Sequence, residues 1–249
     1  MSLLRNVNID AFNGAIINKF MHRHTGTTTT LTVATTGGGT EYQISVADAT
    51  GFAVGDYLHI NTTSIETTHP KIISISSPTG ASVFTLDRRI DMVHNIGDTV
   101  DASVLDVSSI AGTLASPQIY TASPTAGETW YISRLLFEMT HTAAGDLGYF
   151  GGITELTNGV ILRAKISGNY YTFSNWKSNA DIKADMFDVE FDNRATSKGL
   201  YGTSGRGTFK AADTVMVLNG NNGDMFELYV QDDITALNRF TVKIQGHKI

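Results

Sequence analysis

The chain has 249 residues, of which 41% are hydrophobic, no cysteine, and a formal net charge of -6. This length allows one large domain or two smaller ones with buried cores, and the lack of cysteine excludes disulfide scaffolds, thiolate metal sites and cysteine nucleophiles. The 18 basic residues are scattered, so we expect no direct nucleic-acid partner, and 24 glycines against four prolines are typical of a β-rich protein with many tight turns.

The N-terminal arm, residues 1–25, contains apolar residues spaced by three and four over 7–20, which fits a short amphipathic helix. Polar residues interrupt this stretch, so we expect no signal peptide, no membrane insertion and a soluble chain that starts near residue 1. Two interpretations stay open: a helix packed on the chain's own core, or an arm that docks on a neighbouring subunit. The candidate interface residues of the arm are Ile9, Phe12, Ile16, Ile17 and Phe20.

Residues 26–107 are predicted to form a small β-barrel-like module. The threonine- and glycine-rich stretch 25–40 predicts a linker, or a hairpin that carries Leu31 and Val33. Beyond it, short alternating runs separated by turn residues predict five strands, at 42–46, 57–60, 71–75, 83–86 and 99–105.

The stretch DATGFAVGD, residues 48–56, lies between two of these strands and raises the question of whether it binds a ligand or only folds. Asp48 and Thr50 can turn the backbone through their side-chain oxygens, and Gly51 and Gly55 permit positive φ. Folding alone explains the stretch, so we predict a structural role for it.

Residues 108–249 are predicted to form a jelly-roll-like antiparallel β-sandwich with one short helix. Residues 130–139 are apolar at both parities, which predicts a central strand covered on both sides, and 160–166 alternate like a half-exposed strand. The other expected elements are a helix within 175–188 capped by Asn179 or Asp181, a hairpin over 215–230 with its loop at 219–224, and a terminal strand around 240–244.

No local pattern predicts a metal or cofactor site. His22 and His24 offer two imidazoles, but no third ligand lies nearby in the sequence, so two exposed or hydrogen-bonded histidines are the preferred interpretation. The loop at 219–224 resembles a calcium loop faintly, yet Val230 stands where the bidentate glutamate is needed. The glycine cluster at 202–207 lacks the Gly-Lys-Ser/Thr of a P-loop.

The same holds for catalysis. Asp185 with Asp188 and Glu190 with Asp192 are paired carboxylates of the kind that glycosidases use, but on a surface helix and strand they fit a solvated face better. We therefore predict no catalytic residues, no cofactor and no enzymatic activity.

Tyr170, Tyr171, Phe173 and Trp176 form the densest aromatic cluster of the sequence. Core packing is the default interpretation, whereas exposed aromatic side chains stack on sugar rings or insert into partner proteins. The candidate interface residues of the second half are Tyr170, Tyr171 and Trp176.

The order of motifs from about residue 113 to 247 is similar to that of a known group of proteins. The motifs are WYISRLLFEMTH, FGGITELTNGVILRA, NWKSNADIKADMFDVEF and ELYVQDDITALNRFTVKIQGH. They resemble a group of virion structural proteins of tailed bacteriophages, and DATGFAVGD resembles a strand-entry motif of phage tail and baseplate chains.

The resemblance implies a place in a virion, in the tail, in the neck or on the capsid surface, after assembly in the host bacterial cytoplasm. We therefore expect a non-enzymatic structural subunit whose partners are copies of itself, as a homo-oligomer, and other virion structural proteins. The alternative is an adhesin-like module that binds host-surface glycan through the aromatic cluster.

Overall fold

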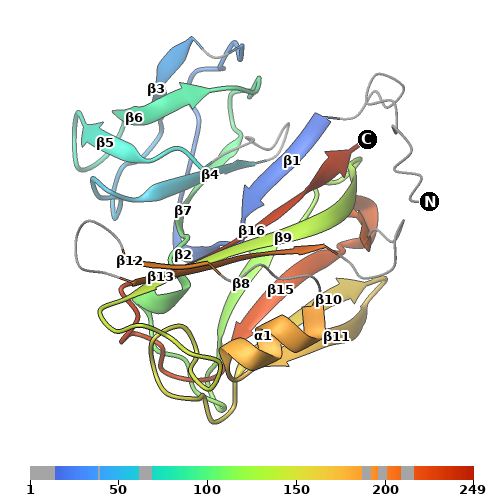
Figure 1. Ribbon diagram of the computed structural model, residues 1–249. Helices are drawn as coiled ribbons and strands as arrows, with labels where there is room; N and C mark the ends of the chain where they lie inside the picture. Colours follow the sequence, from blue (N-terminus) through green and yellow to red (C-terminus); the bar gives the residue numbers. More distant parts are fainter. Residues whose placement is uncertain (1–14, 39, 62–68, 187–191, 196–200, 209–215) are drawn as a thin grey trace.

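Alternating apolar residues and frequent turn residues produce a structure in which almost every regular element is an antiparallel strand (Figure 1). The computed structural model describes residues 15–38, 40–61, 69–186, 192–195, 201–208 and 216–249. The prediction of a mainly β fold is confirmed. Among the described residues, no helix has the length and apolar character needed to cross a lipid bilayer.

The N-terminal module contains six strands: β2 (Arg23–Thr30), β3 (Glu41–Val46), β4 (Tyr57–Asn61), β5 (Ile72–Ile75), β6 (Ser82–Ile90) and β7 (Thr99–Val104). They form two three-stranded sheets, with the orders β2-β7-β4 and β3-β6-β5. Isolated bridges join Leu31 to Val46 and Tyr57 to Lys71, so the six strands follow one another in a ring around their own apolar core. The five strands predicted for this module are all present.

The first part of the threonine-rich stretch, up to Thr30, belongs to the strand β2, whereas the sequence predicted a linker or a hairpin. β2 pairs with β7, with Thr29 opposite Val100 and buried. Threonine is β-branched and suits a pleated surface, so the pairing with β7 outweighs the low hydrophobicity of the stretch.

The turn at 48–56 is held by its own side chains. The Asp48 carboxylate accepts hydrogen bonds from the backbone N–H groups of Thr50, at 2.9 Å, and Gly80, at 3.0 Å. Gly51 and Gly55 have φ angles of 87° and 106°, which other residues rarely adopt. These contacts explain the stretch as a turn between two strands.

The sandwich consists of two antiparallel sheets with one apolar core between them. The six-stranded sheet has the order β1 (Ala15–Phe20), β16 (Arg239–Lys248), β9 (Thr129–His141), β13 (Tyr201–Thr208) and β12 (Asp192–Ala195), and β14 (Met216–Asn219) also pairs with β9. The four-stranded sheet has the order β11 (Asn169–Trp176), β10 (Val160–Ile166), β15 (Met225–Val230) and β8 (Gln118–Ala122). The short 3₁₀ turns are η2 (Val107–Ser109) and η3 (Gly220–Asn222).

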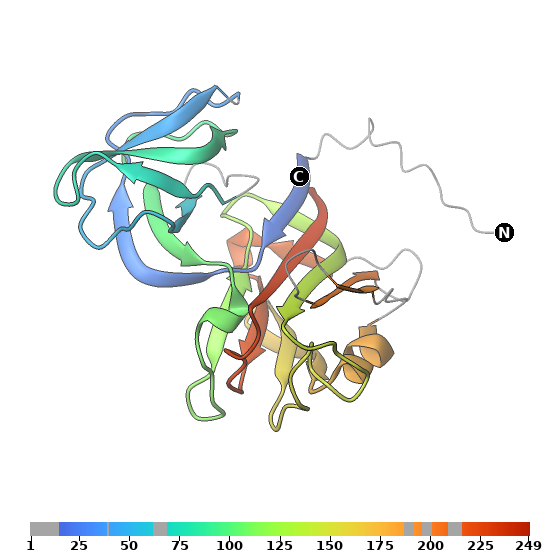
Figure 2. The same ribbon diagram turned by 60° about the vertical axis from the view of Figure 1, so that its left-hand side comes forward.

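The expected N-terminal helix is wrong for residues 15–20, which form β1. This strand pairs with β16 over its whole length, and the two run side by side in both views (Figures 1 and 2). Ile17 is buried while its neighbour Ile16 is 71% exposed, as expected for the alternating faces of an edge strand. Pairing with a distant strand outweighs the helical spacing, and residues 7–14 lie outside the described residues.

The expected hairpin over 215–230 is also wrong. β14 pairs with β9 in the six-stranded sheet, whereas β15 pairs with β8 and β10 in the four-stranded sheet. The loop between them therefore crosses from one sheet to the other, because each strand finds a better partner far away in the sequence. The Asp224 carboxylate closes this crossing by accepting from the N–H groups of Ser167 and Asn219.

Two further elements refine the expectations. β9 is central, as predicted, but only one of its faces is fully buried, since Trp130 and Ile132 point into the core while Tyr131 is half-exposed. The predicted helix is α1 (Asn179–Met186). Its start is a capping box, in which Asp181 accepts from the N–H of Ser178 at 2.9 Å and the Ser178 hydroxyl accepts from the N–H of Asp181. The N-cap is therefore Ser178 and not the predicted Asn179, while Asp181 takes part from the first turn.

A partly buried ion pair fixes the end of β16. The Lys248 ammonium contacts the Glu128 carboxylate, which also accepts a hydrogen bond from the Trp130 indole at 3.2 Å. Burial by itself raises the pKa of Glu128, but Lys248 and the Thr125 N–H outweigh it and hold that pKa below its usual value.

We therefore expect Glu128→Gln to lower the free energy of unfolding by about 1 kcal/mol at neutral pH. Because the folded-state pKa is depressed, the carboxylate stabilises the fold above the unfolded-state pKa of about 4.3, and this stabilisation is lost as the pH falls through the lower folded-state value. Urea unfolding of both proteins at decreasing pH should show their stabilities converging in acid. The exposed Glu155→Gln serves as the control, and a difference that persists unchanged in acid would contradict the prediction.

Candidate functional site

The predicted interface residues lie in different surroundings. In the arm, Ile9 and Phe12 lie outside the described residues. Of the others, Ile16 is exposed, Ile17 is buried against the sandwich core and Phe20 is half-buried. The Lys243 ammonium lies 4.1 Å from the centre of the Phe20 ring. Residues 15–20 thus pack on their own chain and leave Ile16 on the surface.

The aromatic cluster divides between surface and core. Tyr170, Tyr171 and Phe173 are 54%, 52% and 43% exposed, and we call these three residues the β11 aromatic surface. Tyr170 and Tyr171 are neighbours on the strand and point to opposite faces of the sheet, so these side chains flank the edge of β11 on both faces. Trp176 is 1% exposed, and its ring lies 6.0 Å from that of Phe137 on the opposite sheet. Trp176 therefore belongs to the core, although the sequence grouped it with the interface candidates.

One member of the β11 aromatic surface is held in place by a cation. The Arg163 guanidinium lies 4.4 Å from the centre of the Tyr170 ring and 4.3 Å from that of the Tyr229 ring. Its Nε donates a hydrogen bond to the buried carboxylate of Glu227. Because this ion pair fixes the guanidinium, the contact with it restrains the exposed Tyr170 ring. The ring would therefore lose little conformational entropy on binding a partner.

The second candidate site lies at the junction of the two parts. Four of the chain's seven histidines gather there: His22, His24, His59 and His69. The ring centre of His22 lies 4.7 Å from those of His24 and His69 and 4.5 Å from that of His59. We call these four residues the histidine cluster.

Strand register explains how two of these side chains meet. β7 lies between β2 and β4, and it pairs Ser103 with His24 on one side and Asp101 with His59 on the other. Ser103 and Asp101 are two residues apart and so point to the same face of the sheet. His24 and His59 therefore share that face.

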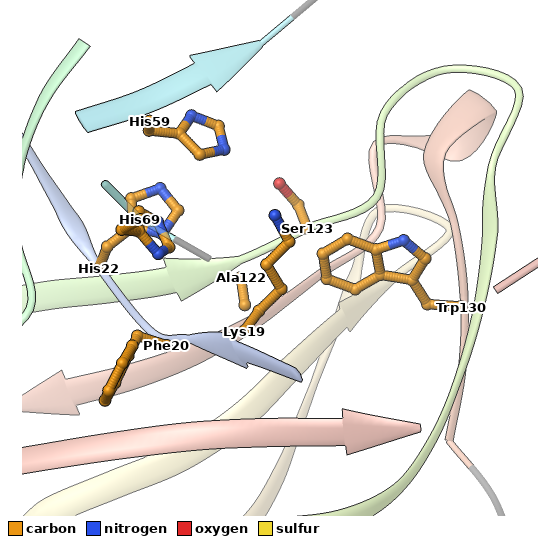
Figure 3. Close-up of a pocket in the computed structure, with 8 residues that line it drawn as sticks. All are labelled: Lys19, Phe20, His22, His59, His69, Ala122, Ser123 and Trp130. Carbon is orange, nitrogen blue, oxygen red and sulfur yellow. The ribbon is translucent and has the colours of Figure 1, made fainter. Parts of the chain in front are cut away.

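His22 comes from the connection between β1 and β2. Its backbone exchanges hydrogen bonds with Thr121 of β8, at 3.0 Å and 2.7 Å, which ties the connection to the sandwich. Figure 3 shows His22, His59 and His69 on one side of a small, partly open space, with Lys19, Ser123 and Trp130 beside them. The space measures about 10 Å³, enough for about one water molecule or one ion.

The buried imidazoles are neutral at neutral pH. Burial, followed by the charge of His24, lowers the pKa of His22 to about 3. Burial also holds the pKa values of His59 and His69 well below the usual range. Neutral imidazoles have a free nitrogen lone pair, the form in which histidine binds a metal.

Three of these residues are arranged so that they could share an ion. One ligand atom from each of His22, His24 and His59 lies within 4.8 Å of the other two. The sequence showed only the first two, because local spacing does not reveal that β4 lies near the connection between β1 and β2. In the folded chain, a third imidazole, that of His59, therefore lies near His22 and His24.

The other acidic candidates are described only in part. The Asp224 carboxylate is buried and satisfied by backbone N–H groups, as described above. Asp188 and Glu190 lie outside the described residues.

Comparisons of the chain with protein-family models, with curated proteins and with solved structures give no match.

Proposed function

We propose that the chain is a non-enzymatic structural subunit of a tailed-phage virion, which assembles with copies of itself and with neighbouring proteins in the tail, in the neck or on the head surface. The observation that supports this most directly is the β11 aromatic surface at the edge of a sheet. The motif resemblance over residues 113–247 supports the assignment to a virion. A jelly-roll-like connectivity of the sandwich is part of the same proposal.

The edge position of β11 makes it suited to contact another chain. Among the described residues, β11 pairs only with β10, so its second side has no strand partner. Natural proteins usually protect such edges with charges, prolines or covering segments, because an open edge pairs with other chains. β11 carries the opposite composition, since Tyr170, Tyr171 and Phe173 expose large apolar surface beside the open edge. We assign this edge to a second copy of the chain.

The first test is the oligomeric state of the purified protein. Light scattering coupled to size exclusion should give a mass that is a multiple of the monomer mass. Tyr171→Lys places a charge within the contact, and we expect it to raise the dissociation constant about 30-fold, the size of a 2 kcal/mol interface hot spot.

Ile73→Lys is the matched control, because Ile73 lies on β5, the last strand of its three-stranded sheet in the other module, and is also 52% exposed. This variant should assemble like the wild type. A monomeric wild type, or an equal loss of assembly in both variants, would contradict the assignment of β11.

Electron microscopy of purified virions labelled on this chain tests the virion function itself, and absence of the label from the particle would exclude that function.

A second candidate function is binding of host-surface glycan. The fixed, exposed ring of Tyr170 favours it, because a rigid aromatic ring can stack on a sugar. A glycan array should then show binding that is lost in Tyr170→Ala and kept in Ile73→Lys. Absence of binding in the wild type leaves the structural role alone.

A further inference from the structure

We propose that His22, His24 and His59 bind one divalent transition-metal ion through their imidazole nitrogens, at the junction between the N-terminal module and the sandwich. The expected ion is Zn²⁺ or another divalent ion that imidazole nitrogens bind well, such as Co²⁺, Ni²⁺ or Cu²⁺. This inference does not depend on the proposed virion function, since it rests on the geometry of the histidine cluster alone.

The spacing of the nitrogens fits such an ion. The Nε2 atoms of His22 and His24 lie 3.3 Å apart. Two nitrogens at about 2.0–2.1 Å from a tetrahedral zinc ion are separated by about 3.3–3.4 Å, so these two already stand at ligand spacing. A ligand nitrogen of His59 lies within 4.8 Å of both. The His59 ring is stacked on that of His22, with ring centres 4.5 Å apart, so binding requires the His59 ring to turn until its nitrogen points at the ion.

The carboxylate of Asp101 lies near the second ring nitrogen of His24. The Asp101 carboxylate lies 3.8 Å from Nδ1 of His24, on the opposite side of the ring from the Nε2 that faces His22. Metal-binding histidines usually turn their second nitrogen towards a carboxylate or a carbonyl, which orients the ring and strengthens the ligand. Asp101 occupies this position for His24.

Several ring nitrogens of the histidine cluster are buried without a hydrogen-bond partner among the described residues, which independently supports a bound ion. Nδ1 of His59 and both ring nitrogens of His69 are buried and have no hydrogen-bond partner among the described residues. An unsatisfied buried polar atom costs about 1–3 kcal/mol, so such a cluster is unfavourable unless something else satisfies it. An ion bound by these three imidazoles would satisfy one nitrogen of His59.

The chemistry of the donors selects the class of ion. Three imidazoles without a thiolate suit zinc, copper, nickel or cobalt, whereas magnesium and calcium require oxygen ligands. Lys19 lines the same space, and its positive charge opposes a cation there. Asp101 offsets part of this charge, and the partly exposed His24 side chain, at 43%, gives the ion a route from solvent.

The test uses the full-length protein without a polyhistidine tag, stripped of metal with a chelator. Titration with Zn²⁺ should show one ion bound per chain, and Co²⁺ should give the visible absorption of a tetrahedral site. We expect His24→Ala to weaken Zn²⁺ binding by at least about 100-fold, since the outer partners of ligands alone account for 10- to 100-fold. Asp101→Asn should weaken it about 10-fold.

Two variants act as controls. His141→Ala removes an imidazole from outside the histidine cluster and should bind Zn²⁺ like the wild type. Lys19→Met removes the opposing charge and should strengthen binding, a result that a purely structural role of the cluster does not produce. Trp130 lines the same space, so quenching of its fluorescence by Co²⁺ reports binding at this place.

The outcomes are distinct. Failure of the stripped wild type to bind Zn²⁺ or Co²⁺, or equal affinity in His24→Ala, would overturn the proposal. If His24→Ala does not fold, as judged by circular dichroism, X-ray absorption of the Zn²⁺-loaded wild type decides the question. A shell of imidazole nitrogens at about 2.0–2.1 Å supports the site, and a shell of oxygens alone overturns it.

Discussion

Trp176→Ala is expected to lower the free energy of unfolding by about 3–5 kcal/mol, the usual cost of removing a large buried aromatic side chain. Trp176 is 1% exposed and packs against Phe137 of β9, so it joins β11 to the opposite sheet. Its indole nitrogen has no hydrogen-bond partner among the described residues, so the whole effect comes from lost packing. Urea unfolding followed by circular dichroism measures the change.

Tyr171→Ala is the matched control for this variant. Tyr171 lies on the same strand but is 52% exposed, so its truncation should change the stability of the monomer by less than about 1 kcal/mol. Equal destabilisation by the two variants would contradict the core placement of Trp176. The comparison also matters for function, because any loss of glycan binding in Trp176→Ala would reflect partial unfolding rather than a lost contact.

Gly246→Ala is expected to destabilise the protein by about 3 kcal/mol, at the upper end of the usual effect of overpacking. A β-carbon at this position would lie 1.9 Å from the carbonyl oxygen of Tyr131, which is backbone and cannot move aside. Gly246 follows directly on the irregularity where the pairing of β16 with β9 shifts between Gln245 and Gly246. The substitution therefore forces apart two central strands of the six-stranded sheet.

Gly148→Ala is the control for this prediction. The nearest atom to its β-carbon, a side-chain oxygen of Asp146, is 3.4 Å away, which is an ordinary contact. Thermal or urea unfolding should show a large loss of stability for Gly246→Ala and little change for Gly148→Ala. A stability of Gly246→Ala close to that of the wild type would mean that the two strands are not held at this distance.

The sequence by itself determined the β class and the place of most strands. The runs at 42–46, 57–60 and 160–166 alternate between apolar and polar residues, and this period of two is a local property that needs no distant partner. The turn at 48–56 is likewise local, because Asp48 and its two glycines supply the geometry within a few residues. The helix α1 is local as well, although the sequence predicted Asn179 or Asp181 as its cap and the N-cap is Ser178, with Asp181 completing the capping box.

Only the tertiary structure decided which strands pair and which side chains meet. β1 is a strand because the edge of β16 accepts its backbone hydrogen bonds, and that partner lies at the other end of the chain. β14 and β15 enter different sheets for a similar reason. The histidine cluster is the clearest case. His24 and His59 come together only through the register of β7, and His22 joins them only at the junction of the two parts, so the residues beside them in the sequence do not reveal the cluster.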